Sequence, residues 1–426
     1  METSPDTARP LRIAYLMTWF PKLTETFVLD EIRVVERCGA VVEIFPLLRK
    51  KGEPVHPEAL PLLLRTHFQP LFSFRIVAAH WHYIRRNPHT YSRTLAELLR
   101  GSVGSLRCLI GALAFFPKAV LFARQMEHLD IDHIHAHFAS NPALSAWIIH
   151  RLTGIPYSFT AHGSDLHVDR TLLDEKVRAA AFAVTVSSYN REVMVGACGE
   201  PMRGKIHVVR SGVDVAALQP KTDWCKDGPL EILCVASLGE VKGHTYLVDA
   251  CRILAKRGID FRCHLVGEGP LRPRITRQIA AAALTGRFQI HGGLARPQVE
   301  RRLRQADLFV LPSVPTPEGR REGIPVALME AMACALPVVA SDLSGIPELV
   351  EHNVCGQLVP PRDSIGLANA IKRYHDNPRL REAMGQAARK KVVDRFDLKK
   401  SAGRLVEHFE HHAAAGIGKE SRCESP

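Results

Sequence analysis

Short apolar runs alternate with amphipathic stretches along most of the chain. Apolar runs of this length, bounded by glycine, proline and polar residues, predict buried β-strands. In the first half of the chain the predicted strands cover residues 11–17, 41–47, 133–138, 157–162 and 183–188. In the second half they cover residues 230–237, 261–267, 288–291, 307–312 and 337–341. The predicted helices between them include residues 142–153, 242–257 and 297–305. This alternation predicts parallel sheets with helices on both faces.

A polar, proline-containing stretch at residues 220–229 interrupts the alternation, which then restarts. Two such series predict an α/β chain with two doubly wound domains in tandem. We expect an N-terminal domain over residues 1–210 and a C-terminal domain over residues 211–395. A helix and tail should follow over residues 396–426, with the helix packing back on the N-terminal domain. Ligands of such sheets bind beyond the carboxyl ends of the strands, so two domains that face each other would share one cleft.

The composition fits a globular protein of this kind. At roughly 150 residues per domain, a chain of 426 residues corresponds to two or three domains. Hydrophobic residues make up 46% and charged residues 23% of the chain, which excludes a collagen, a disordered chain and a coiled-coil rod. Ten cysteines without a C-x-x-C pair predict reduced thiols. The most apolar stretch, residues 108–117, is shorter than the roughly 18 residues that span a bilayer, and no secretory signal begins the sequence, so we expect a cytoplasmic protein.

One long segment, residues 54–125, breaks the alternation, because it is mostly helical and lacks obvious strands. Residues 47–125 carry 12 basic and 3 acidic side chains, hence +9 of the chain's net charge of +12. Aromatic side chains lie among them, namely Phe72, Phe74, Trp81, Tyr83, Phe115 and Phe116. Cationic and aromatic residues together favour an anionic membrane surface as partner; the alternative is an ordinary helical insertion with a solvated basic face. Nucleic acid is not expected, because no helix-turn-helix, zinc-finger or RNA-binding motif accompanies the charge.

The most informative stretch is PEGRREGIPVALMEAMACALPVVASDLSGIPELV, residues 317–350. Proline suits the first turn of a helix and glycine permits close approach to a ligand, so we expect a helix to begin near Pro325, after Gly323 and Ile324. The unpaired N–H groups at such a helix end favour an anion, and a diphosphate is a natural occupant. Glu322 and Glu330 are eight residues apart, roughly 12 Å along a helix, which would place carboxylates on both sides of the phosphate to hold a sugar and a ribose. The alternative is a surface helix with two ordinary glutamates.

The segments EGIPVALMEAMACALPVV and SGIPELV resemble the retaining family-4 glycosyltransferases, which have the GT-B fold. Further matching segments occur in the family's order, namely FPKLTETFVLDEI, FTAHGSDL, RSGVD, SLGEVKG and HLVGEGPLR. The first two of these, with HIHAHF, are most similar to colanic-acid-type enzymes, which build lipid-linked exopolysaccharide repeats. The resemblance implies two Rossmann-like domains that face a cleft, with the acceptor on the N-terminal domain and the nucleotide sugar on the C-terminal domain.

The resemblance assigns most of the donor site to the C-terminal domain. It implies that Glu322 contacts hydroxyls of the donor sugar and that Glu330 holds the nucleotide ribose. The backbone of residues 323–325 would meet the diphosphate, and Lys242 would bind phosphate and offset charge on the leaving group. The alternative for Lys242 is a surface lysine at a helix start, where the helix dipole disfavours a cation.

Two further loops belong to the implied nucleotide site. Gly267 and Glu268 would flank the nucleotide, although this G-x-G sequence resembles a dinucleotide fingerprint only weakly, because Arg272 replaces the third glycine. Leu294 follows two glycines at a position where members of the family contact the base through the backbone.

The sequence departs from the family at two positions. Ser237 stands where the family usually has an arginine, whose charge-assisted hydrogen bond is worth about 1.5–3 kcal/mol. Arg320 or Arg321 would be the substitutes within reach along the chain. Ala335 stands where glycine commonly ends the helix of Glu330, and a left-handed backbone there would cost roughly 1 kcal/mol.

Candidate residues also occur in the N-terminal domain. His162, beside a glycine at the end of a predicted strand, matches the family's active-site histidine near the transferred sugar; a lone histidine is otherwise usually structural. Thr24 and Glu25 lie at the first strand-to-helix turn, where the family touches phosphate or acceptor, and the alternative is helix capping by Thr24. His135 and His137 alternate on one strand like a pair of zinc ligands. We expect no metal, because we find no third ligand at metal spacing and the resemblance implies none.

With the resemblance, these residues predict a retaining, metal-independent glycosyltransferase without a cofactor. It would move a sugar from a nucleotide-diphosphate sugar to a glycan on a polyprenyl diphosphate, in the synthesis of exopolysaccharide or cell-surface polysaccharide. It would be cytoplasmic and peripheral on the inner face of the cell membrane. One alternative is a non-catalytic relative that binds nucleotide sugar or glycan and scaffolds an assembly complex, for which Ser237 is the only support. A phosphorylase or a sugar-nucleotide epimerase on the same fold is a further alternative.

Overall fold

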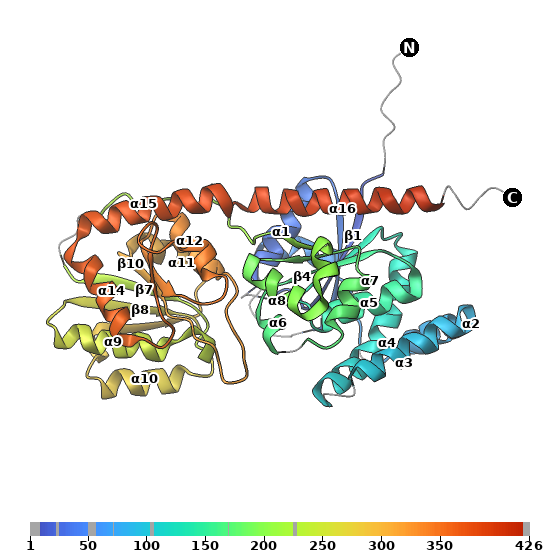
Figure 1. Ribbon diagram of the computed structural model, residues 1–426, viewed down its shortest axis with the longest axis horizontal. Coiled ribbons are helices and arrows are strands. Elements are labelled where there is room, and N and C mark those ends of the chain that lie inside the picture. Colours follow the sequence, from blue (N-terminus) through green and yellow to red (C-terminus); the bar gives the residue numbers. More distant parts are fainter. Residues whose placement is uncertain are drawn as a thin grey trace, which may run out of the picture. The chain divides into compact units, whose positions relative to one another are not determined.

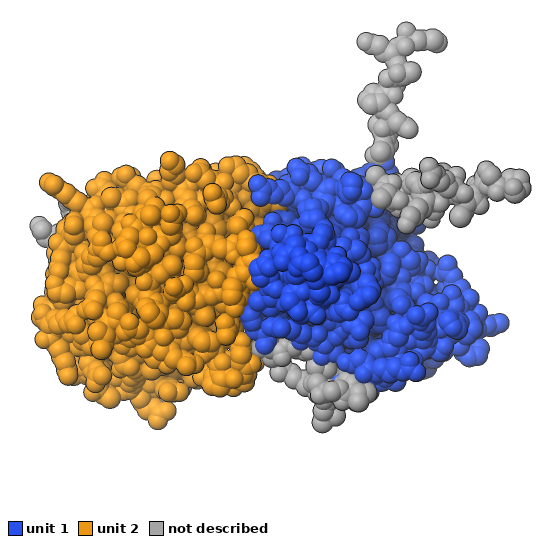
Figure 2. Space-filling model, viewed as in Figure 1, with its two compact units in different colours: residues 1–185, 191–209, 402–426 blue, residues 186–190, 210–401 orange. Residues whose placement is uncertain are grey.

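The chain forms two compact units, which Figure 2 colours separately. The computed structural model describes residues 9–22, 25–49, 57–70, 72–102, 106–168, 170–224 and 228–420. Unit 1 comprises Met1–Thr185, Arg191–Val209 and Ala402–Pro426. Unit 2 comprises Val186–Asn190 and Arg210–Ser401. Each unit is built around its own six-stranded sheet.

The sheet of unit 1 is entirely parallel and has the order β2-β1-β3-β4-β5-β6. The chain lays β2 on one side of β1 and β3 on the other, so the topological switch point of this doubly wound sheet lies between β1 and β3. The strands are β1 (Arg12–Trp19), β2 (Val41–Leu48), β3 (His133–His137), β4 (Tyr157–Ala161), β5 (Phe182–Thr185) and β6 (Ile206–Val208).

Helices cover both faces of this sheet (Figure 1). Alternate residues of β1 enter two separate cores, because successive side chains of a strand point to opposite faces. Ala14 and Leu16 pack with α4 and α5, whereas Ile13 and Tyr15 pack with α1 and with the C-terminal helix α16 (Leu398–Glu420). The helices of unit 1 are α1 (Thr26–Arg37), α2 (Phe74–Arg86), α3 (Pro88–Ser102), α4 (Leu106–His128), α5 (Asn141–Thr153), α6 (Ser164–Val168) and α7 (Leu173–Ala179). Helix α8 (Ser188–Cys198) begins in unit 2 and continues in unit 1.

The described part of the insertion predicted at residues 54–125 is mostly helical, although Thr66 forms a single parallel bridge to Ile44 and residues 67–70 are irregular. It contains two short 3-10 helices, Pro57–Ala59 and Pro61–Arg65, followed by α2, α3 and α4. Contrary to the expectation from sequence, one window of α4, Leu109–His128, is long and apolar enough to cross a membrane. Half of that window is buried within the protein, and Phe116 and Phe122 belong to the core of unit 1. This burial favours a core helix.

The sheet of unit 2 is also parallel, in the order β12-β11-β10-β7-β8-β9. From β7 the chain builds toward β9 on one side and then toward β12 on the other, which is the strand order of a dinucleotide-binding fold. The switch point therefore lies between β7 and β10. The strands are β7 (Leu230–Val235), β8 (Phe261–Val266), β9 (Phe288–Gly292), β10 (Leu308–Leu311), β11 (Val338–Ser341) and β12 (Gln357–Val359).

The helices of unit 2 pack their apolar sides on this sheet to form one continuous core. They are α9 (His244–Lys256), α10 (Arg272–Ala281), α11 (Arg296–Gln305), α12 (Val326–Ala333), α13 (Ile346–Leu349), α14 (Ser364–Asp376) and α15 (Pro378–Arg395). Helix α16 (Leu398–Glu420, red in Figure 1) follows α15 and leaves unit 2 after Ser401. Its side chains Leu405, Val406 and Phe409 are buried in the core of unit 1.

The predicted strands are confirmed, with ends that differ by up to three residues. The prediction for residues 183–188 is too long, because β5 ends at Thr185 and α8 already begins at Ser188. The helix predicted from Lys242 begins at His244, because Lys242 belongs to a 3-10 turn (Glu240–Lys242). The edge strands β6 and β12 were not predicted.

Candidate functional site

The loops at the switch point of unit 2 bring a lysine and a glutamate together. Lys242 follows β7 and Glu322 follows β10, and these two strands are paired neighbours. Lys242 Nζ lies 2.6 Å from Glu322 Oε2, and Ser313 Oγ donates a hydrogen bond of 3.3 Å to the same oxygen. Both charged side chains are largely shielded, with 19% and 15% of their surfaces exposed. Two of the residues assigned to the donor site from sequence are therefore in direct contact at the place where such folds bind ligands.

A glycine allows this approach of the two loops. Gly243, directly after Lys242, has φ of +68°, and a Cβ atom there would lie 1.8 Å from the carbonyl oxygen of Pro312. The backbone N–H of Val314 also donates a hydrogen bond of 2.8 Å to the carbonyl of Val241. A side chain at position 243 would thus push the lysine loop away from the strand end that precedes Glu322.

Helix α12 begins one residue later than predicted, at Val326, with Pro325 as its N-cap. Gly323 and Ile324 lead into it and are buried. Glu322 therefore lies in a loop before the helix and Glu330 lies within the helix, so the spacing of roughly 12 Å expected for two carboxylates on one helix does not apply. The arrangement still places the N-terminus of α12, with its unpaired N–H groups, directly after Glu322.

Helix α12 ends as expected from the departure at Ala335. This residue has φ of +61°, in the left-handed region. The N–H of Ala335 bonds to the carbonyl of Met332, and the N–H of Leu336 bonds to the carbonyl of Ala331. These two bonds form a Schellman motif, which normally carries glycine at the position of Ala335.

Two glycines allow the loop after β8 to lie close against the loop after β7. A Cβ atom at Gly267 would lie 2.0 Å from the carbonyl oxygen of Ala236, and one at Gly269 would lie 2.5 Å from that of Leu238. Glu268, between them, is exposed and pairs with Arg272 through a short contact. Leu294 follows β9 and packs partly against the core of unit 2. The structure thus places these candidate nucleotide residues at carboxyl ends of the same sheet.

Ser237 is exposed in the loop after β7. Of the two possible substitutes for the family arginine, Arg321 donates from Nη1 to the hydroxyl of Tyr189 at 3.1 Å. Arg320 is exposed, and its backbone N–H bonds to Thr316 Oγ1 at 3.2 Å. Arg321 is therefore engaged in a hydrogen bond that the sequence did not reveal.

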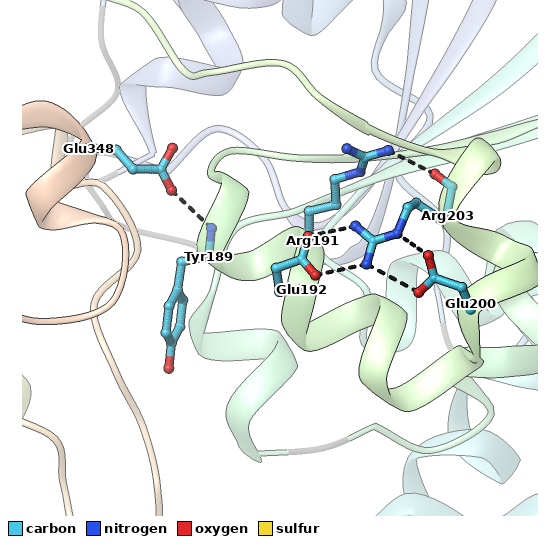
Figure 3. Close-up of polar contacts among 6 residues, drawn as sticks. All are labelled: Tyr189, Arg191, Glu192, Glu200, Arg203 and Glu348. Atoms are coloured by element: carbon cyan, nitrogen blue, oxygen red, sulfur yellow. Dashed lines mark hydrogen bonds and ion pairs between the residues drawn. The ribbon is translucent and has the colours of Figure 1, made fainter.

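Tyr189 also joins Glu348, a residue that the sequence analysis did not select. Its backbone N–H donates to Glu348 Oε1 at 2.9 Å (Figure 3), and Arg210 Nη2 donates to Glu348 Oε2 at 3.1 Å. Figure 3 also shows Arg203 of unit 1, which forms ion pairs with Glu192 and Glu200. The hydrogen bonds from Arg203 lower the pKa of both carboxyl groups. These pairs are exposed on the surface and indicate no binding site.

In unit 1, His162 follows β4, and the carboxylate of Asp165 holds its main chain in place. Both carboxylate oxygens of Asp165 accept hydrogen bonds from main-chain N–H groups, at 3.1 Å from His162, 2.8 Å from Gly163 and 2.7 Å from Ala139. Burial raises the pKa of Asp165, and these N–H groups act against that rise. Burial, together with the neighbouring imidazole of His137, holds the pKa of His162 well below its usual value. His162 is therefore neutral at physiological pH.

The possible metal cluster is larger than the sequence indicated. Glu31, His135 and His137 place one ligand atom each within 4.8 Å of one another, so Glu31 supplies the third ligand that the sequence analysis did not find. Both ring nitrogens of His135 already have hydroxyl partners, Ser158 at 2.9 Å and Thr160 at 3.0 Å. A metal ion would have to replace these hydrogen bonds, and the expectation of a metal-independent enzyme stays a prediction.

At the turn after β1, Thr24 lies outside the described residues. Glu25 occupies the N-cap of α1 without a capping hydrogen bond from its side chain. Its carboxylate instead forms an ion pair of 2.5 Å with Lys22. Glu25 is thus positioned at the switch point of unit 1 but already has a cationic partner.

The family model described as Glycosyltransferase Family 4 matches residues 25–217, and the model described as Glycosyl transferases group 1 matches residues 221–391. The chain is 30% identical over 414 residues to the putative colanic acid biosynthesis glycosyltransferase WcaL of Salmonella typhimurium, covering 91% of this chain and 96% of that protein. It is 40% identical over 209 residues to the amylovoran biosynthesis glycosyltransferase AmsK of Erwinia amylovora. That match and one to WcaL of Escherichia coli (41% identity) span about half the length of this chain and of each relative.

Solved structures with the same architecture cover nearly the whole chain. A glycosyltransferase from Rickettsia africae superposes with a TM-score of 0.70 at 18% identity, over 95% of this chain and 99% of that one. Anabaena Alr3699/HepE, solved in complex with UDP-glucose, superposes with a TM-score of 0.70 at 18% identity, over 94% of this chain and 100% of that one. At this level of identity the similarity establishes the fold.

Proposed function

This chain belongs to the family-4 glycosyltransferases and has the GT-B fold, and from that premise we propose a specific reaction. The enzyme moves a sugar from a nucleotide-diphosphate sugar to a lipid-linked glycan, with retention of configuration, in the synthesis of an exopolysaccharide. The relatives named for colanic acid and amylovoran biosynthesis support the pathway class. We assign the donor to unit 2 and the acceptor to unit 1.

The observation that carries the proposal is the ion pair between Lys242 and Glu322 at the switch point of unit 2. A diphosphate brings at least two negative charges and competes with Glu322 for Lys242, because charge-assisted hydrogen bonds to phosphate are strong. When Lys242 turns to the diphosphate, both oxygens of Glu322 become available to accept hydrogen bonds from sugar hydroxyls. Lys242 and Glu322 thus pair with each other when no donor is bound. When the donor binds, Lys242 binds its diphosphate and Glu322 binds its sugar.

The proposed reaction breaks the bond between the anomeric carbon and the diphosphate oxygen. The acceptor oxygen bonds to that carbon on the same face, and its proton passes to the departing nucleoside diphosphate. Lys242 and the N-terminus of α12 stabilise the charge that develops on the leaving group, which is the kind of electrostatic effect that contributes most to many enzymes. Glu330 on α12 holds the ribose. We assign no carboxylate nucleophile.

We further propose that unit 1 binds an anionic membrane surface on the cytoplasmic side, where lipid-linked acceptors are found. Helix α2 presents Phe74, Val77, Trp81 and Ile84 to solvent, with exposed fractions of 95%, 65%, 61% and 39%. Their spacing of three and four residues places them on one side of the helix. Exposed basic side chains flank this apolar stripe, and Arg85 lies over the ring of Trp81 at 5.7 Å. A basic helix with an apolar side of this kind is typical of interfacial membrane helices.

Calorimetric titration of the purified protein with UDP, GDP and ADP tests the proposal. We expect micromolar binding of one nucleotide and its loss in Glu330→Ala, because the ribose loses its acceptor. Glu382→Ala is the matched control, since this exposed glutamate lies on α15 of the same unit, and its affinity should equal that of the wild type. If no nucleotide binds, the transferase proposal is wrong and a non-catalytic scaffold becomes the better interpretation.

A further inference from the structure

His162 lies at the end of a chain of hydrogen bonds that begins at a carboxylate on α1. Glu31 Oε1 accepts from the hydroxyl of Tyr15 at 3.0 Å and lies 3.1 Å from His137 Nε2. His137 Nδ1 in turn lies 3.1 Å from His162 Nε2. Tyr15, Glu31 and His137 come from β1, α1 and β3, and the chain of hydrogen bonds ends at His162 in the loop after β4.

The direction of each hydrogen bond follows from the chemistry of the carboxylate. An ionised carboxylate only accepts hydrogen bonds, so the proton in its bond to His137 belongs to Nε2. The Nδ1 atom of a neutral His137 is then an acceptor, and the proton between the two imidazoles belongs to His162 Nε2. A neutral imidazole has one N–H group, which leaves Nδ1 of His162 without a proton.

The surroundings hold the His162 ring in this orientation. The rings of Phe27 and Phe138 lie 4.8 Å and 4.7 Å from it, between centroids, and Asp165 holds its main chain. Among the described residues, Nδ1 of His162 has no hydrogen-bond partner, although its side chain is only partly buried. The ring thus offers one acceptor atom that the protein itself does not use.

We propose that Glu31 and His137 are positioning residues that hold His162 as the Nε2–H tautomer, so that its Nδ1 accepts a hydrogen bond from a hydroxyl of the transferred sugar. The sugar is assigned through the proposed function, whereas the tautomer is inferred from the hydrogen-bond distances, with Glu31 ionised and His137 neutral. The chain of hydrogen bonds fixes Nδ1 of His162 as an acceptor, which favours a ligand group that donates a hydrogen bond, such as a hydroxyl. An imidazole free to exchange tautomers would present Nδ1 as an acceptor only part of the time.

Nitrogen-15 NMR of the free protein, labelled on histidine, tests the tautomer without any nucleotide. Glu31→Gln and Glu31→Leu are compared with the wild type, and the His162 signals are assigned by their loss in His162→Gln. We expect a bare Nδ1 and a protonated Nε2 at pH 7.5 in the wild type and in Glu31→Gln, whose amide oxygen still accepts. Glu31→Leu should show a mixture of both tautomers.

A protonated Nδ1 or a charged imidazole in the wild type would overturn the proposal, even if Glu31→Leu fails to fold. In a transferase assay, Glu31→Leu should lower kcat about tenfold, the loss expected for one misdirected hydrogen bond, and Glu31→Gln should restore most of it. Equal kcat in all three proteins would equally overturn the positioning role. Because the NMR measurement needs no donor, its result is independent of whether the proposed function holds.

Discussion

Lys242 and Glu322 are close enough to neutralise each other, and neither has a second ion-pair partner among the described residues. A diphosphate can take the place of Glu322, because it offers the lysine charge-assisted hydrogen bonds that replace the one to the carboxylate. The residue that loses a partner is Glu322, which then faces the neutral hydroxyls of a sugar. In the proposed function, these two residues carry the recognition of the donor.

Lys242→Ala should lower kcat by about 10²–10³, because a preorganised group that stabilises the leaving group is removed. The measurement is release of nucleoside diphosphate under saturating donor. Lys256→Ala is the control, since this exposed lysine ends α9, the helix that follows Lys242, and it should keep the wild-type rate. A rate for Lys242→Ala within twofold of the wild type would exclude the lysine from catalysis.

Ala335→Gly should stabilise the protein by about 1 kcal/mol, because a left-handed alanine costs roughly that amount and glycine does not. Ala333→Gly is the matched control within α12, where the same substitution should destabilise by about 1 kcal/mol. Urea unfolding measures both changes as shifts of the midpoint. Shifts of the same sign in the two variants would contradict the interpretation of the Ala335 backbone.

At the scale of elements, the apolar runs predicted the strands because a strand buried on both faces is apolar throughout. The edge strands β6 and β12 have three residues each, too few to produce such a run. Lys242 and Glu322 were selected from sequence by their motifs. Their contact requires that β7 and β10 be neighbours, which follows from the order of strands and from no local pattern.

The partners of the selected residues were harder to predict. Ser313 lies in the loop two residues after β10, and Glu31 lies in the middle of an amphipathic helix, where it resembles any solvent-facing glutamate. Asp165 was the easiest of these partners to predict, since a carboxylate three residues after His162 is suited to accept hydrogen bonds from the N–H groups of the turn. The other contacts depend on which side chains the sheet brings together.

The apolar side of α2 should govern membrane binding. Replacing Phe74 and Trp81 together by glutamate should weaken binding to vesicles rich in phosphatidylglycerol at least tenfold, because two large apolar side chains lose about 1.5–3 kcal/mol each of burial in the interface. Sedimentation with sucrose-loaded vesicles measures this. Ile365→Glu is the control, because this apolar residue on α14 of unit 2 is as exposed as Trp81, and the variant should bind as the wild type does. Equal binding of all three proteins would reject α2 as the membrane helix.

At the scale of the whole molecule, the buried histidines concentrate in unit 1. Burial lowers the pKa of His133 to about 3 and holds that of His135 and His162 well below the usual value. In unit 2, burial lowers the pKa of His244 to about 4. The unfolded chain binds protons at these imidazoles near pH 6.5, whereas the folded chain does not. Their neutral state therefore supports the fold above pH 6.5, and that support is lost as the pH falls toward the lower folded values.

Unit 1 should accordingly lose more stability than unit 2 between pH 7 and pH 5. For a fully buried imidazole such as His133 the loss approaches about 1.4 kcal/mol per pH unit below 6.5. Hydrogen exchange followed by mass spectrometry, corrected for the intrinsic pH dependence of exchange, reports the change for peptides of each unit. Equal loss of protection in both units would show that these histidines do not determine the acid sensitivity.

Helix α16 is synthesised after the residues of unit 2, yet it completes a core of unit 1 that begins at β1. Leu405, Val406 and Phe409 of α16 pack with Ile13 and Phe182 in one cluster. A ribosome adds about 5–20 residues per second, so β1 leaves the exit tunnel long before α16 exists. All residues of unit 2 precede Ala402 and become available earlier. Unit 1 therefore finishes folding last, and during translation it displays an uncovered apolar sheet face of the kind that chaperones bind.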